Sequence, residues 1–182
     1  MPLKLALIGL PGSGKSSVAK HLAQHYRWAQ VDTDQVFESR VGMPIRDFFS
    51  AHGEAAFRDL ETEVLADCLQ RPGPLVLATG GGIVLRPENR QLLRKQSLVF
   101  FLKQRPEELA RRLKTDTKRP LLQGGDALAK LRDLAGVRDP LYRQSAHYTV
   151  EAQRPTVAAV VQWICMQLEL AGHAPVAPTL EP

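Results

Sequence analysis

The segment Gly9–Ser16 reads GLPGSGKS and matches the GxxxxGK[ST] pattern of a phosphate-binding loop. It follows a short apolar run that has the composition of a buried strand. Gly12 and Gly14 lack a Cβ, so the backbone can curl with its N–H groups inward, and a helix beginning at Lys15 would add its positive end. The pattern therefore predicts a cradle for polyphosphate, in which Lys15 reaches the β- and γ-phosphates and Ser16 ligates Mg²⁺. A Gly-rich turn with a stray lysine is the weaker interpretation, because strand, loop and helix signals follow in order.

Two acidic residues, Asp32 and Asp34, follow the second apolar run, where a second strand should end. Parallel sheets collect their ligands at the carboxyl ends of the strands. One carboxylate could hold Mg²⁺, directly or through water, and the other could orient or deprotonate an attacking hydroxyl. For Asp32 a structural role is equally good, since Gln35 three residues later completes a capping-box-like helix start. For Asp34 we favour the functional role.

Residues 52–69 read HGEAAFRDLETEVLADCL, and their apolar side chains fall on one helical stripe. Glu54, Arg58 and Glu61 line up on another stripe, so Arg58 is held on a defined face. One interpretation is an ordinary surface ion pair between Glu54 and Arg58. The other is an arginine that binds a carboxylate and is steadied by neighbouring acids, because a guanidinium matches a carboxylate in bidentate geometry.

Three consecutive glycines, Gly80, Gly81 and Gly82, follow another apolar run and Thr79. Such a run costs backbone entropy on folding. It could form a bland flexible turn, but close approach of the backbone to a ligand beside the phosphate loop explains it better.

Two further arginines could bind anions. Arg119 belongs to RPLL, which closes a long connection, and Arg138 opens the segment RDPLYRQSAHY shortly before the last apolar run. Residues 103–119 carry seven basic and three acidic side chains, which indicates either a solvated helix or a site for an anionic nucleotide. Both arginines could simply be solvated. For Arg119 we favour a mobile loop that places the guanidinium over a transferring phosphate, stabilises its charge and excludes water.

The elements that must position these residues follow an α/β pattern, which predicts a parallel sheet. Five strands are expected near Lys4–Ile8, Ala29–Val31, Leu75–Ala78, Leu98–Leu102 and Tyr148–Val150. Helices are expected over Ser16–Tyr26, Glu54–Gln70, Pro106–Leu113 and Val157–Leu170. The long connections 35–53 and 114–125 are expected to be insertions that bind substrates. Residues 171–182, rich in Pro and Ala, are expected to form a disordered tail.

Length and composition indicate one globular domain, here placed over residues 1–170 of 182. Apolar residues make up 44% and charged residues 24%, which excludes a collagenous or largely disordered chain. The segment before the phosphate loop has too few residues to form a membrane-spanning helix or a signal peptide, so we expect a cytoplasmic protein. Cys68 and Cys165 lie far apart in apolar helical patterns, which favours buried free thiols over a disulfide or a zinc site.

Taken together and in order, GLPGSGKS, Asp-x-Asp, GExxFRxxE, TGGG, RPLL and RxPLY resemble the shikimate kinase family, over residues 3 to about 170. The phosphate loop is shared by many nucleotide enzymes, whereas the combination of the other motifs is specific. The resemblance implies a three-layer α/β/α P-loop fold like that of nucleoside monophosphate kinases, with five parallel strands, a substrate-binding helical insertion near residues 33–61 and a mobile lid near 114–125. It also implies phosphorylation of the 3-hydroxyl of shikimate by ATP with Mg²⁺, in chorismate and aromatic amino-acid biosynthesis, by a monomer.

The resemblance also implies roles for particular residues. Asp34, Lys15 and Arg119 resemble the catalytic set, with Asp34 as base and the two cations stabilising the transferred phosphoryl group. The substrate side comprises Asp34, Arg58, Glu61, Gly80, Gly81, Gly82 and Arg138, with the two arginines as a carboxylate clamp. The ATP side comprises Gly12, Ser13, Gly14, Lys15, Ser16, Ser17, Arg112, Arg119 and Arg154. Ser16 resembles the Mg²⁺ ligand and Asp32 its outer-shell partner.

Two other functions fit part of the pattern. Another small-metabolite kinase, such as one acting on gluconate, would share the phosphate loop and the lid but not the arginine pair and triple glycine. A nucleotide-dependent module that binds nucleic acid would use the net charge of +5, from 24 basic and 19 acidic residues. That charge is modest, and the sequence lacks the usual aromatic platform for stacking bases, so we expect neither a nucleic acid nor a membrane as partner.

Overall fold

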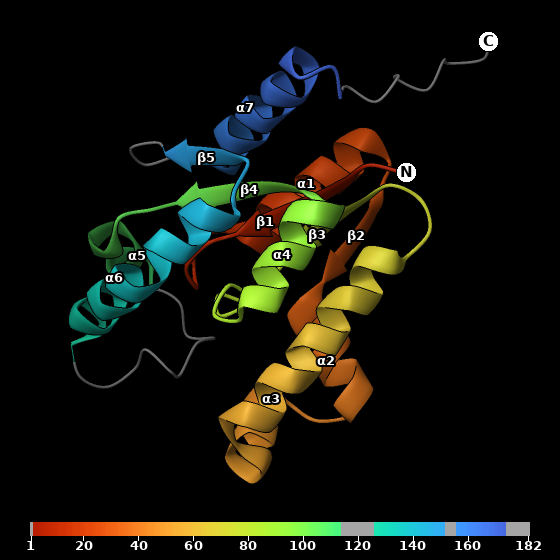
Figure 1. The fold of residues 1–182 in the computed structure, drawn as a ribbon. Coiled ribbons are helices and arrows are strands. Elements are labelled where there is room, and N and C mark those ends of the chain that lie inside the picture. Colours follow the sequence, from red (N-terminus) through yellow and green to blue (C-terminus); the bar gives the residue numbers. More distant parts are fainter. Residues whose placement is uncertain (1, 114–125, 152–155, 174–182) are drawn as a thin grey trace.

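A computed structural model describes residues 2–113, 126–151 and 156–173 of the chain. Its centre is a parallel sheet in the order β2-β3-β1-β4-β5 (Figure 1). The strands are β1 (Lys4–Ile8), β2 (Ala29–Asp32), β3 (Leu75–Ala78), β4 (Leu98–Lys103) and β5 (Tyr148–Glu151). All five predicted strands are confirmed, and β2, β4 and β5 each end one residue later than expected.

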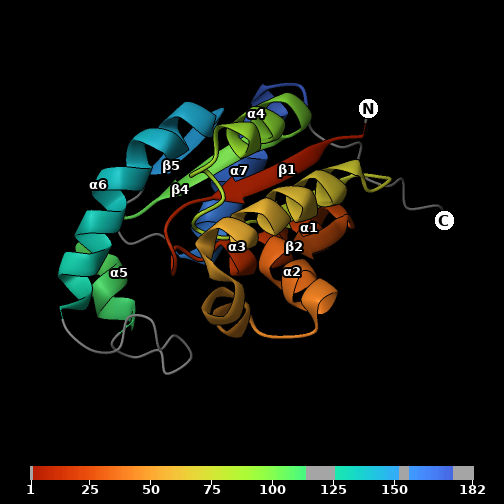
Figure 2. The same cartoon turned by 60° about the horizontal axis from the view of Figure 1, so that its bottom comes forward.

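Alternation along the strands divides the core between the two faces of the sheet. Leu5 and Leu7 of β1 join the cluster that packs under α1 (Lys15–Tyr26) and α7 (Val157–Leu170). Ala6 and Ile8 join the opposite cluster, which is covered by α3 (Ile45–Gln70), α4 (Pro87–Gln96) and α6 (Ala127–Ser145). Turning the molecule shows the sheet between these helix layers, with α5 (Pro106–Leu113) beside α6 (Figure 2). The structure thus confirms the predicted three-layer α/β/α arrangement.

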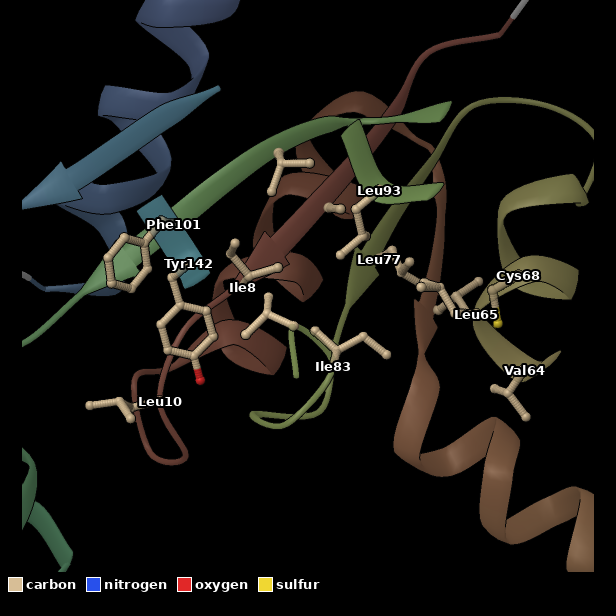
Figure 3. Close-up of a cluster of buried hydrophobic side chains, with 14 of the residues drawn as sticks. Ile8, Leu10, Val64, Leu65, Cys68, Leu77, Ile83, Leu93, Phe101 and Tyr142 are labelled. Carbon is tan, nitrogen blue, oxygen red and sulfur yellow. The ribbon is translucent and has the colours of Figure 1, made fainter. Parts of the chain in front are cut away.

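The second cluster reaches from the sheet to the segments that carry the predicted site. Figure 3 shows Ile8, Leu77 and Phe101 from three strands packed with Leu65 of α3 and Tyr142 of α6. The cluster continues into Leu10 and Ile83, which lie in the turns after β1 and β3. These turns are therefore anchored by buried apolar side chains, although they contain several glycines.

Three helices were not predicted as such: α2 (Thr33–Val41), α4 and α6. The connection expected over 35–53 is helical, because α2 fills its first part and α3 begins at Ile45. The predicted start at Glu54 corresponds to a kink, since Gly53 inside α3 has φ 81° and ψ 174°. The predicted lid at 114–125 and most of the predicted tail at 171–182 lie outside the described residues.

Both cysteines are free thiols, with Cys68 fully buried and Cys165 half-buried, so burial is confirmed in full only for Cys68. In the ranges that the structure covers, none of the helices combines the length and apolarity needed to cross a bilayer.

The kink in α3 gives a test of this fold. Gly53→Ala should lower the free energy of unfolding by about 1–3 kcal/mol, because its backbone conformation is one that residues with a Cβ rarely adopt. Gly136→Ala in α6 is the matched control: an added methyl meets no atom within 4 Å, and helix propensity should raise stability by ~0.5–1 kcal/mol. Urea unfolding measures both variants, and equal effects of the two substitutions would contradict the kink.

Candidate active site

The phosphate-binding loop curls as its glycines predict. Gly12 and Gly14 have φ 85° and 89°, and α1 begins at Lys15 directly after Gly14. Lys15 is buried, and its Nζ donates to the carbonyl oxygens of Gly9 and Leu10 at 2.8 and 3.0 Å. These bonds hold the ammonium group inside the curve of the loop. The backbone N–H groups at the start of α1 and this ammonium together favour an anion there.

The carboxylate of Asp32 fills both roles that the sequence left open. Its Oδ1 accepts from the backbone N–H of Asp34 at 3.0 Å and so caps α2. Its Oδ2 accepts from the Ser16 hydroxyl at 2.8 Å. A hydroxyl and a carboxylate that converge beside a phosphate loop are hard oxygen donors of the kind that Mg²⁺ binds, with its other positions filled by water and phosphate. The residues therefore fit a Mg²⁺ ion.

Asp34 occupies the first turn of α2. The residue is open to solvent on one side, yet burial of its carboxylate raises the pKa to about 6, aided by the negative charge of Asp32. The charge of Lys15 acts in the opposite direction, and Glu61 adds a smaller upward effect. A carboxylate with this pKa is ionised at neutral pH and more basic than an ordinary aspartate, which suits it to accept a proton.

The triple glycine is explained by close approach, although the approaching groups belong to the protein. A Cβ on Gly80 would lie 2.6 Å from Oδ1 of Asp34, and one on Gly81 would lie 2.8 Å from Cδ of Pro11. A Cβ on Gly82 would lie 2.5 Å from Nη1 of Arg58. The turn therefore packs against the acid at one end, the phosphate loop in the middle and the arginine at the other end. The interpretation as a bland flexible turn is wrong.

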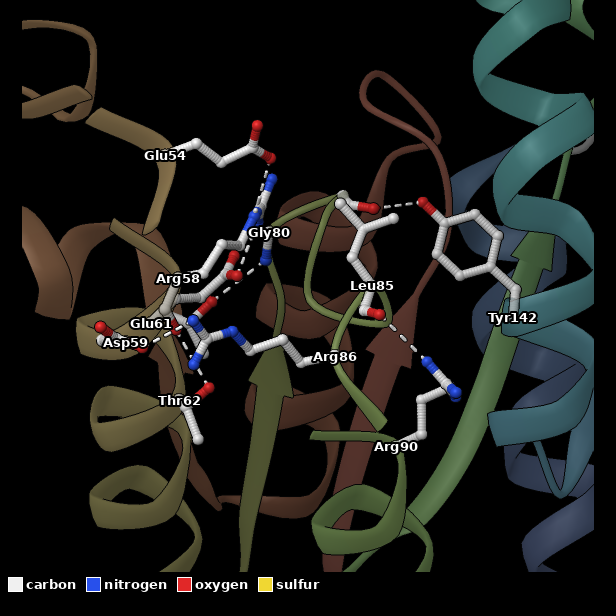
Figure 4. Close-up of polar contacts among 12 residues, drawn as sticks. Glu54, Arg58, Asp59, Glu61, Thr62, Gly80, Leu85, Arg86, Arg90 and Tyr142 are labelled. Atoms are coloured by element: carbon white, nitrogen blue, oxygen red, sulfur yellow. Dashed lines mark hydrogen bonds and ion pairs between the residues drawn. The ribbon is translucent and has the colours of Figure 1, made fainter. Parts of the chain in front are cut away.

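Arg58 is held by several groups at once, as Figure 4 shows. Its Nη1 bonds Oε2 of Glu61 at 2.6 Å, its Nε lies 3.5 Å from Oε1 of Glu54, and its guanidinium lies over the ring of Phe57. The Arg58 side chain is only 13% exposed, so a simple surface pair with Glu54 does not describe it. Glu61 is buried, which raises its pKa, and the positive charge of Arg58 is the main opposing effect.

Arg138 lies half-buried in α6 and completes this side of the site. Its charge lowers the pKa of Glu61, as does the charge of Arg86, which forms an ion pair with Asp59 at 2.6 Å (Figure 4). The charge of Arg138 therefore acts on the same acidic group that steadies Arg58. The predicted role of Arg138 in a carboxylate clamp stays a prediction.

The structure describes only some of the residues that were predicted to bind ATP. Ser13 and Ser17 lie in the loop and in the first turn of α1, as expected. Arg112, near the end of α5, donates from Nη1 to Oε1 of Gln104 at 2.9 Å, and Nε2 of Gln104 donates to the carbonyl of Ser13 at 3.2 Å. Arg119 and Arg154 lie outside the described residues, so their predicted roles stay predictions.

Sequence reasoning missed Gln104, Pro11 and Tyr142 as parts of the site. Gln104 is buried and links Arg112 to the phosphate loop, but a lone glutamine after a strand carries no signal. Pro11 lies within the recognised loop pattern, yet its contact with Gly81 joins segments far apart in the chain. Tyr142 donates from its hydroxyl to the carbonyl of Gly81 (Figure 4). The quoted motif RxPLY contained this tyrosine, and only its arginine was given a role.

Comparison with known proteins agrees with this geometry. The profile of the shikimate kinase family matches residues 11–169. A curated relative, the shikimate kinase of Paracidovorax citrulli, is 52% identical over 178 residues, covering 97% of each chain.

Solved structures show the same likeness in three dimensions. A shikimate kinase from Acinetobacter baumannii, solved in complex with shikimate, superposes with a TM-score of 0.86 at 37% identity, covering 96% of this chain and 97% of that one. A gluconokinase from Sinorhizobium meliloti gives a TM-score of 0.60 at 20% identity over 98% and 95% of the two chains, which shows a shared fold alone. The predicted P-loop kinase fold is thus confirmed.

The raised pKa of Asp34 has a consequence for stability. A carboxyl whose pKa is higher in the folded state destabilises the fold as the pH rises from about 4 to above 6, so Asp34→Asn should be more stable than the wild type at pH 7.5 and equally stable at pH 4. The full pKa difference would correspond to about 3 kcal/mol. Water on the open side screens the charge, and we expect roughly 1 kcal/mol.

Urea unfolding at the two pH values measures this gain. Asp133→Asn, at an exposed position in α6, is the control and should change stability by less than ~0.5 kcal/mol at both. A gain for Asp34→Asn that is the same at pH 4 and pH 7.5 would refute the assignment of the raised pKa.

Proposed function

The chain belongs to the shikimate kinase family, and on this premise we propose that it transfers the γ-phosphoryl group of ATP to the 3-hydroxyl of shikimate. The products are 3-phosphoshikimate and ADP, in the synthesis of chorismate and aromatic amino acids. One observation carries the proposal: the triple-glycine turn packs against Asp34 at one end and Arg58 at the other. A base for a hydroxyl and a cation for a carboxylate thus stand at the two ends of one short turn.

On the substrate side, Arg58 and Arg138 bind the carboxylate of shikimate. Arg58 is suited to this because Glu61, Glu54 and Phe57 fix the orientation of its guanidinium before a substrate arrives. Glu61 orients the arginines, and the backbone of the glycine turn contacts the ring of the substrate. This arrangement fits a hydroxylated carboxylic acid better than a neutral sugar.

On the nucleotide side, the loop from Gly12 to Ser17 binds the phosphates with its backbone N–H groups. Lys15 neutralises charge on the transferred group, a task for which its position inside the loop suits it. Ser16 would hold Mg²⁺ and Asp32 would hold a water of its outer shell, and the ion would supply positive charge that neutralises the phosphates. Arg112 and Arg154 flank the adenine, and Arg119 covers the transferred phosphoryl group from the lid at 114–125.

In the reaction, Asp34 accepts the proton of the 3-hydroxyl while the oxygen of that hydroxyl forms a bond to the γ-phosphorus. The bond between this phosphorus and the bridging oxygen breaks, and ADP leaves with the bonding electrons. The pKa of Asp34, near 6, leaves the group largely ionised at neutral pH. Catalysis otherwise consists of positioning and charge stabilisation.

The same proposal includes a cytoplasmic monomer without a nucleic-acid partner. Several basic side chains are already matched by acids: Arg40 with Asp67, Lys103 with Glu151, and Arg132 with Glu107. These pairs reduce the positive potential available to a polyanion, which speaks against the nucleic-acid alternative.

The proposal is tested by ADP release from the purified protein with Mg²⁺ and ATP, with shikimate, gluconate, quinate or no acceptor. Release that depends on shikimate, and that Asp34→Asn abolishes, is the expected result. If no acceptor raised ADP release above background in folded, ATP-binding protein, the proposed function would be wrong. Release driven by gluconate would favour the other kinase.

Arg58→Ala tests the carboxylate clamp. Loss of a charge-assisted, bidentate contact should raise KM for shikimate roughly 10- to 100-fold and leave KM for ATP within twofold. Arg71→Ala, at the far end of α3, removes the same charge at an exposed position and serves as control. Steady-state kinetics measures both constants, and an unchanged KM for shikimate in Arg58→Ala would count against the clamp.

A further inference from the structure

Tyr142 is a completely buried side chain of α6 whose hydroxyl donates to the backbone carbonyl of Gly81 (Figure 4). We propose that Tyr142 is a positioning residue that sets the spacing between Arg58 and Arg138, and thereby the fit of the substrate carboxylate. The inference rests on the proposed function, because it concerns the two arginines of the clamp. Tyr142 itself has no assigned contact with either substrate.

The first half of the clamp takes its position from the glycine turn. A Cβ on Gly82 would lie within 3 Å of three atoms of the Arg58 guanidinium, so the backbone of the turn forms a wall against that group. Glu61 holds Nη1 of the same guanidinium at 2.6 Å. Arg58 therefore cannot shift toward the turn without displacing it.

The turn itself has anchors that do not involve α6. Nη1 of Arg90, from α4, donates to the carbonyl oxygens of Val84 and Leu85 at 2.8 and 3.2 Å. Backbone bonds also close the turn, from the N–H of Ile83 to Gly80 and from the N–H of Leu85 to Gly82. The glycine turn is consequently held in place without α6, and α6 can be positioned by a contact with it.

Arg138, the second arginine of the clamp, is connected to the glycine turn through Tyr142. Arg138 lies four residues before Tyr142 in the same helix, so both side chains lie on one face of α6. Burial raises the pKa of the Tyr142 hydroxyl to about 12, and the charge of Arg138 and a hydrogen bond from its side chain act in the opposite direction, so the two groups are close. The hydroxyl stays protonated at working pH and remains a hydrogen-bond donor.

An external anchor matters here because α6 is weakened between its two functional residues. Pro140 lies inside the helix, lacks an N–H, and cannot donate to the carbonyl of Gly136. Gly136 itself lowers helix propensity. The hydrogen bond to Gly81 fixes the helix against the glycine turn at the point where helical bonding alone is incomplete.

The test is Tyr142→Phe, which keeps the packing of the ring against Phe101, with 4.9 Å between ring centroids, and removes only the hydroxyl group. KM for shikimate should rise about 10-fold, the effect of one lost hydrogen bond, while KM for ATP stays within twofold. Tyr148→Phe is the matched control, because that ring stacks on Phe100 at the other face of the sheet. It should change neither constant by more than twofold.

A double-mutant cycle distinguishes positioning from general loosening. In an Arg138→Gln background, Tyr142→Phe should change KM for shikimate by less than twofold, because the residue that it positions is gone. A 10-fold effect retained in that background, equal rises of both KM values, or no rise in the single variant would each overturn the inference. Wild-type turnover with shikimate reports separately on the proposed function, whereas the ratio of variant to wild type reports on Tyr142.

Discussion

The arrangement of the site depends on a steric constraint at the end of β3, where three side chains approach one stretch of backbone more closely than a Cβ would allow. Asp34, Pro11 and Arg58 come from α2, the phosphate loop and α3, and they meet the successive residues Gly80, Gly81 and Gly82. The turn is thus the common surface against which the acid, the nucleotide loop and the arginine are assembled. Their positions relative to one another follow from contacts with the same short stretch of backbone.

Strand order explains why these groups can meet. β1 lies between β3 and β4, and β2 lies beyond β3, so the carboxyl ends of β1, β2 and β3 are neighbours at one edge. The two aspartates at that edge differ in the groups that surround their carboxylates. Asp32 is engaged by Ser16 and by the start of α2, whereas Asp34 is left with a raised pKa. Two aspartates two residues apart in the sequence therefore have different chemistry.

The features that sequence could predict are those whose cause is local. Buried parallel strands appear as short apolar runs, and the phosphate loop is a contiguous pattern. The predicted strand ends and the predicted start of α1 therefore lie within one residue of those in the structure. Helix α2 was missed because it is short and mostly polar, and the start of α3 because a glycine kink interrupts its pattern. Helix α4 was missed because its residues are mostly polar, and helix α6 because Pro140 lies inside it. Contacts such as Tyr142 with Gly81 join residues 61 positions apart, and no local pattern encodes them.

The two oxygens of the Asp32 carboxylate accept hydrogen bonds from different elements, α1 and α2. This has a consequence for the binding of a cation. Because one oxygen caps α2 and the other receives the Ser16 hydroxyl, folding of the first turn of α2 orients the acid that we propose for the metal side of the loop. The conformational entropy of that side chain is lost during folding and not at the moment of binding. The proposed cation site would in this sense be preorganised by a helix cap, and the stability of a nine-residue helix would set part of its affinity.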